Sequence, residues 1–116
     1  MTTQEASQIT HQAVTYTICL DQLVARFGDT LNNFTIVEKL DLLAILAFWQ
    51  SSNACNLEFD SKPNSLREYL NLEPGLQDAT SQDVDQALQI LADCSENDSL
   101  TLMKVIVNQV IDLRQN

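Results

Sequence analysis

The sequence predicts an all-α fold, a compact bundle of four main helices plus one short helix in a single domain spanning residues 1–116. Glycine and proline are rare, with two of each, so a turn-rich β architecture is not expected. Apolar residues recur at helical spacing in several separate stretches. Some of these stretches also begin with Ser or Thr followed three residues later by an acid, as in a capping box.

The first helix is predicted from about Glu5 to Phe27. Its apolar residues alternate in steps of four and three, which places them on one stripe of a helix. These residues are Ile9, Ala13, Tyr16, Leu20, Leu23 and Phe27. Gly28 follows directly, at the position where glycine commonly ends a helix.

The second helix is predicted from Ile36 to about Ser52, and the polar run "QSSN" is expected to end it. Thr35 and Glu38 fit a capping box, in which each side chain accepts a hydrogen bond from the backbone amide of the other residue. The segment that follows, 53–64, is expected to be a linker with a short extended piece at residues 56–59. Pro63 disfavours helix at the residue before it.

A second capping box, Ser65 with Glu68, predicts a short helix through about Leu72. The sequence Glu73-Pro74-Gly75 then breaks the chain. A third box, Thr80 with Asp83, predicts a helix to about Cys94. Its buried face is expected to hold Val84, Ala87, Leu88 and Leu91.

The last helix is predicted from Leu100 to about Arg114, with Asp98 or Ser99 as its N-cap. The β-branched run "VIVNQVI" is also compatible with a strand. Helix is preferred because the apolar spacing repeats and no partner strand is evident. The expected buried side holds Met103, Ile106, Val110 and Leu113, and is widened by Leu102, Val107 and Ile111.

Composition excludes several classes of function. The formal net charge of -10 argues against direct binding to nucleic acid or to anionic membranes, and favours a basic partner. The polar N-terminal segment is unlike a signal peptide, and the longest apolar run is too short to span a membrane. The three cysteines lack metal-ligand spacing and are expected to be reduced, so a cytoplasmic protein is predicted.

The sequence contains no recognisable catalytic or cofactor-binding motif. His11 is the only histidine and has no cysteine or carboxylate at a useful spacing. The two glycines stand apart, so there is no phosphate-binding loop, and no zinc pattern is present. We therefore predict a protein that is not an enzyme and that has no cofactor or metal.

The window from Arg67 to Lys104 contains no positive charge between its ends. Its acids include Glu73, Asp78, Asp83, Asp85, Asp93, Glu96 and Asp98. One interpretation is a solvated helix face with its flanking loops. The other is a surface that docks a basic protein, for which Asp83, Asp85 and Asp93 are the candidate residues.

The unbroken apolar run from Leu42 to Trp49 is the most informative stretch. A surface helix needs only an apolar stripe, so a helix that is apolar all round is expected to be central in the bundle. Phe48 and Trp49 project roughly 100° apart on a helix. One interpretation places both in the core, and the other makes one of them an anchor for a dimer or another protein.

Residues 41–48, "DLLAILAF", resemble a helix of the helical N-terminal domain of the cyanobacterial orange carotenoid proteins. Residues 25–27 and 88–94 resemble other segments of that domain more loosely. The resemblance implies an all-α fold with a site for a carotenoid. Ala47 and Gln50 stand where the family has aromatic residues that line the pigment, so no binding residue is carried over.

The predicted function is protein–protein interaction by a small acidic adaptor or regulator, whose partner is basic or itself binds nucleic acid. Its candidate contact residues are Trp49, Phe48, Asp83, Asp85 and Asp93. A homodimer is also expected, because the first two helices carry more apolar surface than one small bundle covers. The alternative is a carrier whose second and last helices enclose a hydrophobic small ligand such as a carotenoid.

Overall fold

The computed structural model describes residues 18–78 and 80–115, and within these ranges it contains six helices and no strand. The all-α prediction is therefore confirmed for this part of the chain. The helices are α2 (Ile18–Phe27), α3 (Ile36–Glu58), α4 (Leu66–Leu72), α5 (Pro74–Asp78), α6 (Gln82–Leu91) and α7 (Glu96–Gln115). Four of them are long and two are short, so α5 is an addition to the predicted set.

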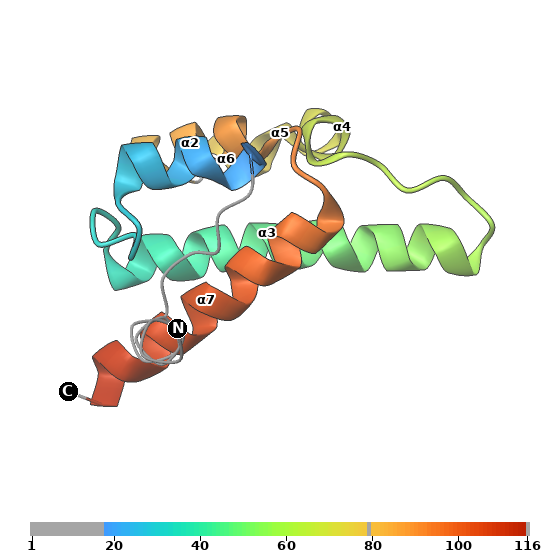
Figure 1. The fold of residues 1–116 in the computed structure, drawn as a ribbon. Coiled ribbons are helices and arrows are strands. Elements are labelled where there is room, and N and C mark those ends of the chain that lie inside the picture. The colour runs from blue at the N-terminus through green and yellow to red at the C-terminus, as the bar shows by residue number, and fades with distance from the viewer. Residues whose placement is uncertain (1–17, 79, 116) are drawn as a thin grey trace.

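The long helix α3 is the platform against which α6 and α7 pack (Figure 1). Helices α2 and α6 lie together above α3, and α7 crosses α3 on another side. Helix α7 runs antiparallel to α3, because Glu96 at its start meets Gln50 and Gln109 near its end meets Lys39. The apolar core fills the space between these helices and includes Leu20, Leu23, Leu42, Leu46, Trp49, Leu88, Leu91, Leu102 and Ile106.

The end of α2 follows the predicted pattern. Gly28 has a φ of +89°, a conformation that glycine adopts readily, and a Cβ there would lie 2.5 Å from Asn32 Oδ1. Leu20, Leu23 and Phe27 are buried as expected. The other members of that predicted stripe, Ile9, Ala13 and Tyr16, lie outside the described residues. The loop after Gly28 adds Leu31 and Phe34 to the core, and Phe34 stacks on Phe27 with ring centroids 4.3 Å apart.

Helix α3 begins as predicted but does not end as predicted. Both hydrogen bonds of the Thr35–Glu38 capping box are present. The helix continues through residues 53–58, so the expected linker and extended piece there are wrong. It ends in a Schellman motif: the amide of Ser61 donates to the carbonyl of Asn56, and Asp60 takes a φ of +57°. Asp60 occupies the position that glycine usually takes, so the sequence lacks the usual signal for this helix end.

Helix α4 matches its prediction, with both bonds of the Ser65–Glu68 capping box in place. Glu73 interrupts the chain as expected, but Pro74 then opens the short helix α5, since proline is well suited to a first helical position. Helix α6 begins one residue later than predicted, because Ser81 rather than Thr80 is its N-cap, and it ends at Leu91. Its predicted buried face is confirmed.

Helix α7 is helical as predicted, but it begins at Glu96, before the expected start at Leu100. The hydroxyl of Ser95 accepts a hydrogen bond from the Asp98 amide, so Ser95 takes the capping role predicted for Asp98 or Ser99. The side that faces the core is also narrower than predicted. Leu102, Ile106 and Val110 are buried. Three residues that the sequence predicts on the buried side are exposed instead, namely Val107, Ile111 and Leu113.

Candidate functional site

One side of α3 carries an exposed, uncharged and mostly apolar surface, which we call the α3 outer face. It consists of Val37, Leu40, Ala44, Ala47, Phe48, Ser51 and Cys55, all of which are exposed. These positions follow the three- and four-residue steps of a helix, so they share a face. The opposite side of α3 carries Leu42, Ile45, Leu46, Trp49 and Asn53, all buried. The core therefore covers only one side of the helix formed by the apolar run from Leu42 to Trp49.

The two adjacent aromatic residues of α3 point in different directions. Trp49 is 1% exposed, and its indole N–H donates to the carbonyl of Asn64 over 2.8 Å. Phe48 is 59% exposed and lies on the α3 outer face. The structure thus places Trp49 in the core, so the interface interpretation now rests on Phe48.

A polar network beside Trp49 locks α3 to two other segments. Asn53 is 1% exposed, donates through Nδ2 to the Asn64 carbonyl over 2.9 Å, and accepts from the Asn64 amide over 2.9 Å. The same Nδ2 group donates to a carboxylate oxygen of Glu96 over 2.6 Å. Gln50, one turn earlier, donates to the Glu96 carbonyl. We call these four residues the Asn53 clamp, and it holds the segment before α4 and the start of α7 against α3.

The start of α3 is held to α6 through Glu38. One carboxylate oxygen accepts from the Thr35 amide over 3.0 Å, and the other accepts from the Ser81 hydroxyl over 2.7 Å. The hydrogen bond from the Thr35 backbone, followed by that from Ser81, holds the pKa of Glu38 below its ordinary value. Because Ser81 is also the N-cap of α6, one carboxylate joins the first turns of two helices.

Lys39 is a buried cation between α3 and α7. It is 4% exposed, and its Nζ donates to Oε1 of Gln109 over 2.9 Å. Burial lowers the pKa of Lys39, because desolvation penalises the charged form. It is the only Lys or Arg in α3, and because it is buried, α3 has no exposed cation beside its outer face.

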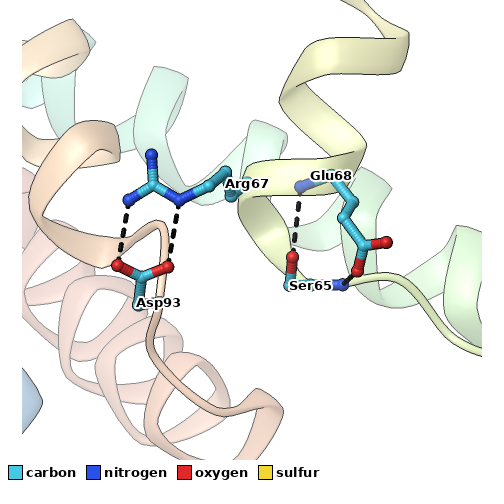
Figure 2. Close-up of polar contacts among 4 residues, drawn as sticks. All are labelled: Ser65, Arg67, Glu68 and Asp93. Carbon is cyan, nitrogen blue, oxygen red and sulfur yellow. Dashed lines mark hydrogen bonds and ion pairs between the residues drawn. The ribbon is translucent and has the colours of Figure 1, made fainter.

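The three acids predicted to bind a basic partner, Asp83, Asp85 and Asp93, have different surroundings. Asp93 makes a two-pronged ion pair with Arg67, with N–O distances of 3.0 and 2.9 Å (Figure 2). This pairing lowers the pKa of Asp93 and raises the pKa of Arg67. Asp83 and Asp85 lie in the first turn of α6, on either side of the buried Val84, where the helix dipole favours negative charge.

The Arg67–Asp93 pair lies beside a helix start that is satisfied by its own cap. The Glu68 amide donates to the Ser65 hydroxyl over 3.1 Å, and the Ser65 amide donates to the Glu68 carboxylate over 2.9 Å (Figure 2). The Arg67 amide also donates to the Ala92 carbonyl, which joins the start of α4 to the end of α6. We interpret this region as a structural junction.

The cysteines differ from one another. Cys94 is disulfide-bonded and Cys55 is a free, exposed thiol. The prediction of reduced cysteines is therefore wrong for Cys94. The side chain of Cys19 lies outside the described part of the chain. Within the described ranges, no group of His, Cys, Asp and Glu side chains could hold a metal ion. His11 also falls outside the described residues.

A small cavity lies between α4 and α6. Its volume is about 30 Å³, and its lining comes from Arg67, Leu70, Asn71, Gln89 and Ala92. Pockets for organic ligands usually measure about 300 Å³ or more, so this cavity does not suit a carrier. The alternative of a hydrophobic ligand between α3 and α7 stays a prediction.

The chain matches no protein-family model, no curated protein and no solved structure. The resemblance of residues 41–48 to the orange carotenoid proteins therefore stays a prediction. In the part of the chain that the structure describes, none of the helices has the length and apolar character needed to cross a membrane.

Proposed function

We propose that this protein acts through protein–protein contact, as an adaptor or regulator rather than as an enzyme, and that the α3 outer face is its binding surface. One observation carries the proposal. Phe48, a large aromatic residue, is 59% exposed about midway along the α3 outer face, whose other members are also exposed. Contiguous exposed apolar surface commonly marks an interaction site, and aromatic residues often contribute most of the binding energy.

The rigidity of α3 supports this proposal. The Asn53 clamp holds the C-terminal half of the helix, and the Glu38 carboxylate holds its start to α6. The face between these two points therefore has a fixed backbone before any partner arrives. A preorganised surface loses less conformational entropy on binding, which favours affinity.

We propose a secondary role for the acids of α6 in contact with a basic protein. Asp83 and Asp85 are half-buried, and the described residues offer neither of them an ion pair. Asp93 is a weaker candidate because Arg67 already neutralises it. Reversing the charge of Asp83 and Asp85 together should lower the affinity for a basic partner and reduce the salt dependence of binding. Binding with unchanged strength and salt dependence would exclude this role.

Site-specific photocrosslinking tests the main proposal. A photoreactive phenylalanine analogue is placed at Phe48 or at Leu40 of the full chain, and each protein is irradiated in an extract of the source cells. Leu72 is the matched control position, because it is a large apolar residue that is 66% exposed and belongs to α4 instead of α3. We expect the same crosslinked protein from positions 48 and 40, and its absence from position 72.

Competition sharpens this experiment. When the crosslinked partner is a different protein, an excess of unlabelled wild-type chain should suppress the crosslink, whereas an excess of the Phe48→Ser variant should not. Both proteins should first show the same circular dichroism spectrum and melting temperature. Equal crosslinking from positions 48 and 72, or equal competition by the variant, would mean that the α3 outer face is not the binding surface.

A further inference from the structure

Helix α7 carries a second apolar stripe that the core leaves uncovered. Leu100 is 49% exposed, Val107 is 40% exposed and Ile111 is 47% exposed, and half-buried Met103 lies beside them. These residues follow one another in steps of three and four, so they share a face of α7. We call this set the α7 stripe.

The charges around the two apolar surfaces have opposite signs. Lys104 and Arg114 lie on the same side of α7 as the stripe, at helical spacing from Val107, and both are exposed. Asp41 lies at the edge of the α3 outer face, three residues before Ala44, and Glu58 lies near its far end. No salt bridge among the described residues involves any of these four charged groups.

We propose that the partner of the α3 outer face is a second copy of this chain, which places its α7 stripe on that face. This inference rests on the proposed function and names the partner for the same site. Apolar side chains then meet apolar side chains, while Lys104 and Arg114 approach the acids of the other copy. Placing two α3 outer faces together would instead bring Asp41 and Glu58 of both copies near each other without an exposed cation on that helix.

Symmetry and area both favour the reciprocal arrangement. Each copy owns one α3 outer face and one α7 stripe, so a two-fold axis makes the same contact twice. One helix-to-helix contact is smaller than the roughly 800 Å² per partner that a stable interface usually needs. Two such contacts double the buried area. They also bury the α3 outer face and the α7 stripe of both copies, which are exposed to solvent in the monomer.

Sedimentation equilibrium of the purified full chain tests the inference. The apparent mass should rise with concentration from 13.0 kDa to twice that value. Phe48→Ser on α3 and Val107→Asp on α7 should each raise the dimer dissociation constant by about tenfold or more. Leu72→Ser should leave it unchanged. All variants are first matched to the wild type by circular dichroism and thermal melting.

A charge-swap cycle identifies which surfaces meet. Lys104→Glu and Asp41→Lys should each weaken the dimer by about threefold to tenfold, because each places like charges in contact. The double variant should regain part of this loss, since it restores opposite charges in the reversed order. A dimer that depends on Phe48 but ignores both Val107→Asp and Lys104→Glu would overturn the proposed pairing.

The two proposals fail in different ways. A chain that stays at 13.0 kDa up to about 1 mM, but forms a position-48 crosslink with another protein in extract, refutes self-association and supports the proposed binding surface. A chain that stays monomeric and gives no position-48 crosslink overturns both. A concentration-dependent dimer that also passes the charge-swap cycle supports both.

Discussion

Asn53 and Asn64 hydrogen-bond to each other in both directions, since the Asn53 amide donates to the Asn64 carbonyl and its oxygen accepts from the Asn64 amide. Asn64 lies in an irregular segment, where its backbone amide and carbonyl have no helical partner. The Asn53 side chain supplies the hydrogen bonds to both groups. The same Asn64 carbonyl also accepts from Trp49, so this one backbone group anchors two side chains of α3. The loop before α4 is thereby held against the platform.

Removing the Asn53 side chain should destabilise the protein strongly. Asn53→Ala leaves the Asn64 amide and the Glu96 carboxylate without their buried partner, so we expect a loss of about 2–3 kcal/mol in the free energy of unfolding. Urea denaturation measures it. Asn56→Ala is the matched control one turn later, because Asn56 makes only a 3.4 Å contact with the Lys62 carbonyl, and it should cost less than about 1 kcal/mol. Equal losses would contradict the role of the clamp.

Trp49 should behave as a core residue in solution. It is the only tryptophan, so fluorescence reports on it alone. Because the ring is 1% exposed, we expect blue-shifted emission and weak quenching by acrylamide. Denaturation should shift the emission to the red and increase quenching. Strong quenching of the folded protein at micromolar concentration would show that Trp49 faces solvent, contrary to the structure.

The Glu38 carboxylate should make stability depend on pH in the acid range. Its pKa is lowered in the folded state, first by the hydrogen bond from the Thr35 backbone and second by that from Ser81. A lowered carboxyl pKa adds stability that is complete above the unfolded value, near pH 4.3, and is lost as pH falls through the folded value. Glu38→Gln should therefore cost about 0.5–1 kcal/mol at pH 7 and less at about pH 3.

Urea titrations of the wild type and of Glu38→Gln at both pH values measure this difference. Asp29→Asn is a suitable control, since Asp29 is an exposed loop carboxyl with no side-chain hydrogen bond in the described part of the chain. Its effect should be small at both pH values. A cost of Glu38→Gln that is the same at pH 3 and pH 7 would contradict the assigned role of the ionised carboxylate.

Lys39 should make stability depend on pH in the alkaline range. Burial lowers its pKa, so the unfolded chain binds more protons than the folded chain between the lowered value and about 10.4. Stability from this group therefore rises as pH increases through that range. Lys39→Met removes the desolvation cost of the charge while keeping the bulk, and should raise the melting temperature at pH 7. The gain should shrink toward pH 10.

Differential scanning calorimetry of the wild type and of Lys39→Met at pH 7 and at about pH 10 measures this change in melting temperature. Lys62→Met is the control, because Lys62 is exposed in the segment before α4 and lies outside both proposed contact surfaces. That substitution should change the melting temperature little at either pH. A large destabilisation by Lys39→Met would instead mean that the hydrogen bond to Gln109 outweighs the cost of burying the charge.

Local signals predicted the helices well. The Thr35–Glu38 and Ser65–Glu68 boxes and the stop at Gly28 all depend on residues within four positions of one another, so the chain itself displays them. The buried face of α6 was predicted for the same reason. The sequence does not single out the start of α7, because Asp98 and Ser99, which follow Ser95, are also common N-cap residues. It does not mark the end of α3, because Asp60 replaces the usual glycine.

The sequence by itself determined that the described part of this chain is helical and where α3 and α4 begin, because capping and apolar spacing are short-range properties. Only the tertiary structure decided that α3 continues past its polar run, since the groups that satisfy Asn53 include Glu96, 43 residues away. It also decided that Trp49 is covered while Phe48, Val107 and Ile111 are not. Periodicity shows that side chains share a face, but which face is buried depends on the helices that pack against it.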